Sequence, residues 1–145
     1  MKRRPPDEAL IKHGRRPQDF QIAQARAVYV APSREQAWEI AAKPLHYMTE
    51  QYVRWFIEAS DMPGADAALK ALVSVEDMLQ KQSFDFLDEQ AIVGTPQDAI
   101  EMIEEYQTRG RMTHFVCYFP TSGMPAHLIR AGMTLFAREV IPHFR

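Results

Sequence analysis

Two short apolar runs limit what this chain can fold into. Residues 25–30 and 114–119 are apolar at most positions and lack the polar alternation of a strand with one face in water. Each run is predicted to be a strand covered on both faces, as in parallel sheets layered with helices. Helical segments follow each run, so the order strand, helices, strand, helix predicts an α/β fold. Two such strands alone leave backbone edges unpaired.

Between the two runs the sequence is predominantly helical. Ser33 and Gln36 form a capping box at the start of a helix, and Pro44 is expected to kink or break that helix. Residues 65–81 are predicted to be a further helix, and residues 83–90 a loop or short turn. A stripe of large apolar side chains at helical spacing lies between Pro44 and that helix: Met48, Tyr52, Trp55 and Phe56. The stripe is open to two interpretations, core packing or the lining of an apolar substrate pocket.

The segment 91–98 combines a short extended run with a helix start. Thr95 is the predicted N-cap, Pro96 occupies the first helical position, and Asp98 closes the capping box near the positive end of the helix dipole. The helix is predicted to end at Gly110.

Length and composition exclude several classes of protein. The chain has 145 residues, a length that predicts one domain over 1–145. Its 17 Lys+Arg and 19 Asp+Glu give a net charge of −2. A complete eight-fold β/α barrel takes about 250 residues, so a whole barrel is excluded. No run is long enough to span a membrane, and the single cysteine suits a reducing compartment, so we expect a cytoplasmic protein. Residues 1–16 are expected to be a frayed terminus and not a nucleic-acid patch, because no aromatic residues interleave with their basic residues.

Phosphate and metal sites are not indicated. The six glycines are scattered, so no glycine-rich phosphate cradle is present. The five histidines match no metal-binding spacing, and Cys117 lies in an aromatic strand with no neighbouring cation, as an inert thiol would. We expect no metal site.

The loop after the second apolar run, residues 119–125, lies where parallel α/β sheets and barrels place their ligands. Gly123 gives this loop backbone freedom, and Met124 offers a soft apolar surface to a flat ring. A plain connection between strand and helix is the alternative interpretation.

Three segments together resemble the luciferase-like flavin-dependent monooxygenases. They are the strand and helix start at residues 28–38, the segment 91–101 with its helix, and the stretch from His114 through Gly123-Met-Pro to Arg145. The likeness covers roughly residues 8–145, and these residues resemble the C-terminal part of that family's proteins. A histidine often follows the family's Gly-Met-Pro, whereas here Ala126 does and His127 is displaced by one, so no role is carried over to His127.

The resemblance implies an incomplete (β/α)8 TIM-barrel fragment. Residues 25–30 would be its seventh strand, 114–119 its eighth, and 43–90 a helical insertion that covers the site as a lid. The lid residues would be Tyr52, Trp55 and Phe56. The residues expected to contact cofactor or substrate are Tyr29, Tyr118, Pro120, Gly123 and Met124, with no catalytic residue assigned.

The function implied is the C-terminal part of a flavin-dependent monooxygenase, an oxidoreductase. Reduced FMN, or a deazaflavin in some members of the family, and dioxygen would oxidise a small organic substrate, while this chain supplies pocket wall and lid. The chain alone is expected to bind FMN weakly and to need either a complementary barrel part or self-association. The alternative is a non-catalytic interaction or assembly module derived from that fold.

Overall fold

A computed structural model describes residues 6–59, 72, 74–83, 91–110 and 112–145. A short helix α1 (Pro6–Lys12) and a 3-10 turn η1 (Pro17–Asp19) precede the first strand, β1 (Ala23–Val30). The remaining elements, in chain order, are α2 (Arg34–Ala59), α4 (Val75–Lys81), β2 (Ala91–Gly94), α5 (Pro96–Gly110), β3 (His114–Tyr118), α6 (Ala126–Glu139) and η2 (Ile141–Phe144). Whether residues 1–16 fray stays a prediction.

The sheet has three parallel strands with β1 in the centre, in the order β2-β1-β3. The short extended run at 91–94 is therefore a third strand, which lies beside β1 and not between β1 and β3. Its register pairs Ala27–Val30 with Ala91–Gly94, whereas β3 pairs with Ala23–Ala27 on the other edge. Each edge of β1 is thus strand-paired over only about half its length among the described residues, and the sheet is not closed.

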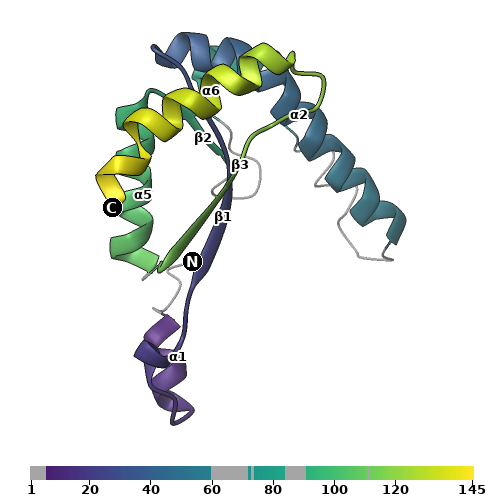
Figure 1. Ribbon diagram of the computed structural model, residues 1–145. Coiled ribbons are helices and arrows are strands. Elements are labelled where there is room, and N and C mark those ends of the chain that lie inside the picture. The colour runs from purple at the N-terminus through teal and green to yellow at the C-terminus, as the bar shows by residue number, and fades with distance from the viewer. Residues whose placement is uncertain (1–5, 60–71, 73, 84–90, 111) are drawn as a thin grey trace.

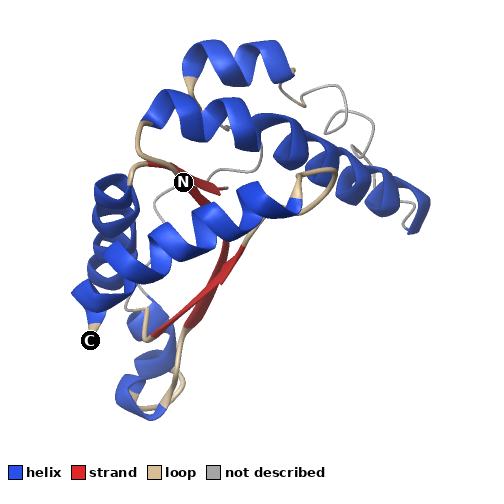
Figure 2. Cartoon of the chain, turned by 45° about the horizontal axis from the view of Figure 1, so that its top comes forward, coloured by secondary structure: helices blue, strands red, loops and turns tan. Residues whose placement is uncertain are grey.

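Alternate residues of β1 enter two separate cores, because successive side chains of a strand point to opposite faces. Val28 and Val30 pack with α5 and α6, in a cluster that includes Ile103 and Phe136. Tyr29 packs on the other side with α2, which contributes Ala37, Trp38, Ala41, Ala42 and Leu45 to this cluster. Figure 1 shows α5 and α6 beside the strands, and Figure 2 shows the helices gathered around the sheet.

The expectation that both apolar runs are covered on both faces is wrong for β3 and for the first half of β1. In β3, Phe115 and Cys117 are half-buried, whereas His114, Val116 and Tyr118 are exposed. Ala23 and Ala25 are also exposed, and burial of β1 becomes complete only from Ala27 onward. The cause is that α2 covers the sheet only at the C-terminal half of β1, so part of one face has no covering layer in the described chain.

Of the kink or break expected at Pro44, the break is wrong, since α2 continues through that residue as a single helix. A proline inside a helix removes a hydrogen bond and crowds the preceding turn. Here Pro44 itself is buried, with the buried residues Ala41, Ala42 and Leu45 beside it in the helix, and this burial offsets the cost of the proline. Beyond Thr49 only Val53 is buried in the described part, and α2 extends away from the sheet in Figure 1.

The helix predicted at 65–81 is confirmed over Val75–Lys81, where Ser74 is the N-cap and accepts a hydrogen bond from the Asp77 amide at 3.1 Å. Residues 65–71 and 73 lie outside the described residues, as do residues 84–90 of the expected loop. No helix in the described ranges is long and apolar enough to cross a membrane.

Candidate functional site

Three of the expected pocket residues, Tyr29, Pro120 and Met124, are buried. The Tyr29 hydroxyl donates to the carbonyl oxygen of Leu128 at 3.0 Å, and burial raises the pKa of this phenol, so it stays a protonated donor. Met124 belongs to the same apolar cluster, and Pro120 is fully buried. The hydrogen bond of Tyr29 to Leu128 thereby connects α6 to the central strand β1. Contact of these three residues with a ligand stays a prediction.

The loop between β3 and α6 turns sharply before the last helix. The Met124 amide donates to the carbonyl oxygen of Thr121 at 3.2 Å. Gly123 has a φ of +73°, in the left-handed region that favours glycine, and no described atom lies within 4 Å of the position a Cβ would take. Gly123 is therefore a point of this loop with open space beside its backbone.

The other expected residues lie at the end of β3 and on the far half of α2. Tyr118 ends β3 and is 43% exposed, while Tyr52 and Trp55 on α2 are 53% and 56% exposed. The two rings on α2 meet edge to face, with centroids 5.4 Å apart at 75°. Burial raises the pKa of Tyr118, and the neighbouring Tyr52 phenol raises it further. We call Tyr52, Trp55 and Tyr118 the aromatic face.

The exposure of the aromatic face bears on the core-packing interpretation of the stripe on α2, whereas the lining of a substrate pocket stays a prediction. Core packing is wrong for Tyr52 and Trp55, each of which is more than half exposed, whereas Met48 is half-buried. The side chain of Phe56 lies outside the described residues. Large aromatic groups left this exposed are more typical of a surface that binds something than of a finished core.

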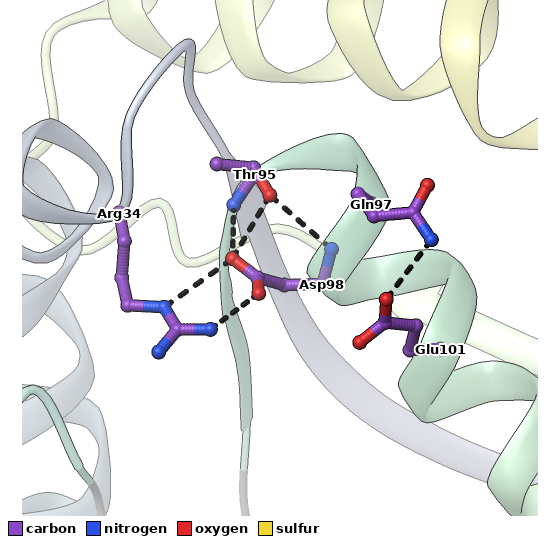
Figure 3. Close-up of polar contacts among 5 residues, drawn as sticks. All are labelled: Arg34, Thr95, Gln97, Asp98 and Glu101. Atoms are coloured by element: carbon purple, nitrogen blue, oxygen red, sulfur yellow. Dashed lines mark hydrogen bonds and ion pairs between the residues drawn. The ribbon is translucent and has the colours of Figure 1, made fainter.

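A polar network joins the starts of α2 and α5, and the sequence predicts its capping box but not the part of Arg34 in it. Asp98 accepts from the Thr95 amide at 2.8 Å and hydroxyl at 2.9 Å, and its own amide donates to Thr95 Oγ1 at 3.2 Å, which confirms the capping box. Arg34 adds an ion pair and a hydrogen bond from Nε to Asp98 Oδ2 at 3.3 Å (Figure 3). Arg34 holds the pKa of the Asp98 carboxyl below its ordinary range, and Thr95 adds to this effect.

Two hollows flank this network and the last helix. One of about 330 Å³ lies between α2, β2 and α5, where Arg34, Asp98 and Glu101 line it beside Trp38. The buried indole nitrogen of Trp38 has no hydrogen-bond partner in the part of the chain that the structure describes. A second hollow of about 400 Å³ lies between the start of α2 and α6, with Arg130 and Arg138 among its lining residues.

The described side chains do not favour a metal-binding site or a reactive cysteine. Within the described ranges, no group of three or more His, Cys, Asp or Glu side chains is placed to hold a metal ion. Cys117 is half-buried, and this burial raises the pKa of its thiol, which disfavours the reactive thiolate. His143 contacts Glu104 at 2.8 Å, a pairing that joins η2 to α5.

The parallel strands, each followed by a helix, define part of a β/α-barrel fold. Residues 7–113 match the luciferase-like monooxygenase family, and the chain belongs to that family. Among solved structures it is similar to a riboflavin lyase crystallised with modified FMN and its substrate riboflavin, at 17% identity and a TM-score of 0.56. The match covers 96% of this chain and 34% of the lyase, so the chain spans about a third of that enzyme's length. No curated protein matches the chain.

Proposed function

We propose that this chain forms the C-terminal pocket wall and lid of a luciferase-like, flavin-dependent enzyme. The observation that carries the proposal is the unclosed parallel sheet of the described residues, in which Tyr118 is exposed at the C-terminal end of β3. That end of the strands is where barrel enzymes bind their ligands. The riboflavin lyase with the same fold holds flavins, which supports a flavin as the cofactor class.

The described residues fit the ring of a flavin better than its phosphate. The aromatic face offers flat apolar surface, and the Tyr118 phenol, protonated at neutral pH, offers a hydrogen-bond donor. The six glycines of the chain form no phosphate cradle, so the phosphate would need residues from elsewhere. When bound, a reduced flavin would supply the activation of dioxygen, while this chain would orient the substrate and exclude water.

The open edges of the sheet are where a complementary part would join. Among the described residues these are the outer edges of β2 and of β3, together with the edge of β1 over residues 23–26 that β2 does not reach. Unpaired strand edges bind other strands through their backbone hydrogen-bonding groups. We propose that the remaining barrel strands pair there, and that self-association occurs when they are absent.

Reconstitution tests the function. The chain is to be co-expressed with the preceding strands of a luciferase-like barrel, and flavin is measured after desalting together with flavin-dependent oxygen consumption. We expect the complex to retain flavin and the chain alone to retain none. Val116→Lys, which places a charge on the uncovered face of β3, should prevent assembly, whereas Glu76→Lys on the exposed side of α4 should not. An assembled complex without flavin, or stoichiometric flavin on the chain alone, contradicts the proposal.

The lid, about residues 43–90, is proposed to open and close through the far half of α2. The first half of that helix packs its buried face on the sheet, whereas beyond Thr49 only Val53 is buried in the described part. Segments with few buried contacts open at low free energy. We therefore expect backbone amides 50–58 to exchange much faster than amides 37–45 in native-state hydrogen exchange. Equal protection of both halves would make the whole helix ordinary core.

A further inference from the structure

The hollow between the start of α2 and α6 has an apolar floor. Tyr29, Val30 and Ala31, at the end of β1, are buried and line it. Both helices add further apolar side chains to the lining, namely Ile40, Leu128 and Leu135. Its volume of about 400 Å³ lies within the range of small-molecule pockets, which are mostly apolar with a few polar groups.

The exposed polar side chains that line this hollow are largely not engaged with the protein. Gln36 on α2 and His127 and Arg130 on α6 make no side-chain hydrogen bond or ion pair within the described residues. Arg138 has a partner, Glu139, but that glutamate is not among the described residues that line the hollow. These side chains can therefore bind a ligand without breaking a contact between described residues.

The charge of this hollow is positive, although the chain carries a net charge of −2. Its described lining contains two arginines and neither aspartate nor glutamate. Arg130 and Arg138 are eight positions apart on α6 with Thr134 midway, and helical residues four apart lie on the same face. The three side chains thus form a stripe along the hollow. Guanidinium groups bind carboxylates and phosphates through paired, charge-assisted hydrogen bonds.

The apolar floor and the arginine stripe together define the class of ligand. An inorganic anion alone would leave the floor in contact with water, and an uncharged apolar molecule would make no use of Arg130. An ion pair formed beside an apolar floor is also screened less by salt than one on an open surface. A compact molecule with an apolar body and an anionic head group satisfies both parts of the hollow.

We propose that this hollow binds a small organic anion, with its apolar body on the floor and a carboxylate or phosphate head group at Arg130. None of the residues of the aromatic face, and none from β2 or β3, is among the described residues that line it. Tyr29 is the one expected pocket residue in that lining, and its hydroxyl is already bonded to Leu128. The inference therefore goes beyond the proposed flavin site and does not depend on it.

NMR titration of the full 15N-labelled chain tests the proposal, read at the backbone amide of Gly132 and at Nε of Arg130. The probes are 4-phenylbutyrate and 3-phenylpropyl phosphate, which share one apolar body. We expect both signals to shift with at least one of these anions, and the tighter anion identifies the head group. Neutral 4-phenylbutanamide and acetate alone should each bind at least tenfold more weakly. Arg130→Gln should weaken binding about tenfold, as loss of a charge-assisted hydrogen bond predicts.

Two further variants make the test specific. Arg109→Gln removes the same charge from α5, where Arg109 is exposed and is not among the described lining residues, so the affinity should stay unchanged. Ala131→Leu adds volume to the α6 side of the hollow at an exposed position without changing the charge, and should weaken binding at least tenfold. Equal effects of the two arginine variants, equal affinity for the amide and the acid, or an unmoved Gly132 signal each overturn the proposal.

The reconstituted complex separates this hollow from the flavin site. Saturating FMN should leave the titration with the preferred anion unchanged, whereas displacement of that anion by FMN overturns the proposal and assigns the hollow to the cofactor. Shifts that follow only protein dilution also overturn it and identify a contact between copies. Failure of the proposed function is recognised separately, because a complex that retains no flavin leaves the titration of the chain alone as it was.

Discussion

Replacing Gly132 with valine is expected to destabilise the fold by about 2–3 kcal/mol, as overpacking of a tight core does. A Cβ at this position of α6 would lie 2.8 Å from Cε2 of Tyr29 and 3.2 Å from its Cδ2. The Tyr29 ring cannot move aside freely, because it is buried and its hydroxyl is bonded to Leu128 of the same helix. Valine adds two further methyl groups, so α6 must shift from β1.

Denaturant unfolding measures this cost, with Ala131→Val as the matched control. Ala131 is the exposed neighbour on α6, so its substitution reports only the helix cost of a β-branched residue. Gly132→Ala should fall between the two, because about 1 kcal/mol of gained helix propensity offsets part of the overlap. Equal stabilities of the two valine variants would show that the Tyr29–Gly132 contact does not constrain the fold.

The second large effect is expected at Gly94, where alanine should cost about 2 kcal/mol. A Cβ there would overlap Oδ2 of Asp98, and its distance to the Cγ of that side chain would be 3.0 Å. Asp98 cannot turn away without losing its bonds to Thr95 and Arg34. In the background Asp98→Ala the same Gly94→Ala change should therefore cost less, with a coupling of about 1 kcal/mol in the double-mutant cycle. Additive effects of the two changes would contradict this account.

The pH dependence of stability follows from the same carboxylate. Asp98 has a lowered pKa in the folded chain, with Arg34 as the main cause, so its ionised form stabilises the fold. That contribution is fully present above the ordinary aspartate pKa of about 3.9 and is lost as the pH falls through the lower folded-state value. The difference in unfolding free energy between the wild type and Asp98→Asn should thus shrink on acidification. A difference that stays constant down to strong acid would exclude this linkage.

Local features of the chain could be predicted because they depend on neighbours in sequence. The Thr95–Asp98 capping box and the Ser33–Gln36 contact are both confirmed. Each arises from hydrogen-bond geometry within a few residues. The family resemblance, carried by short segments, is confirmed as well.

The tertiary structure decided the features that join residues far apart in the chain. Arg34 reaches Asp98 across 64 positions, Tyr29 packs on Gly132, and β2 lies on the side of β1 away from β3. The apolar character of β3 indicates a strand that can be buried, but whether a layer covers it depends on which elements pack there. Burial belongs to the assembled layers and not to the strand itself, which is why the exposure of Tyr118 could not be predicted from the sequence alone.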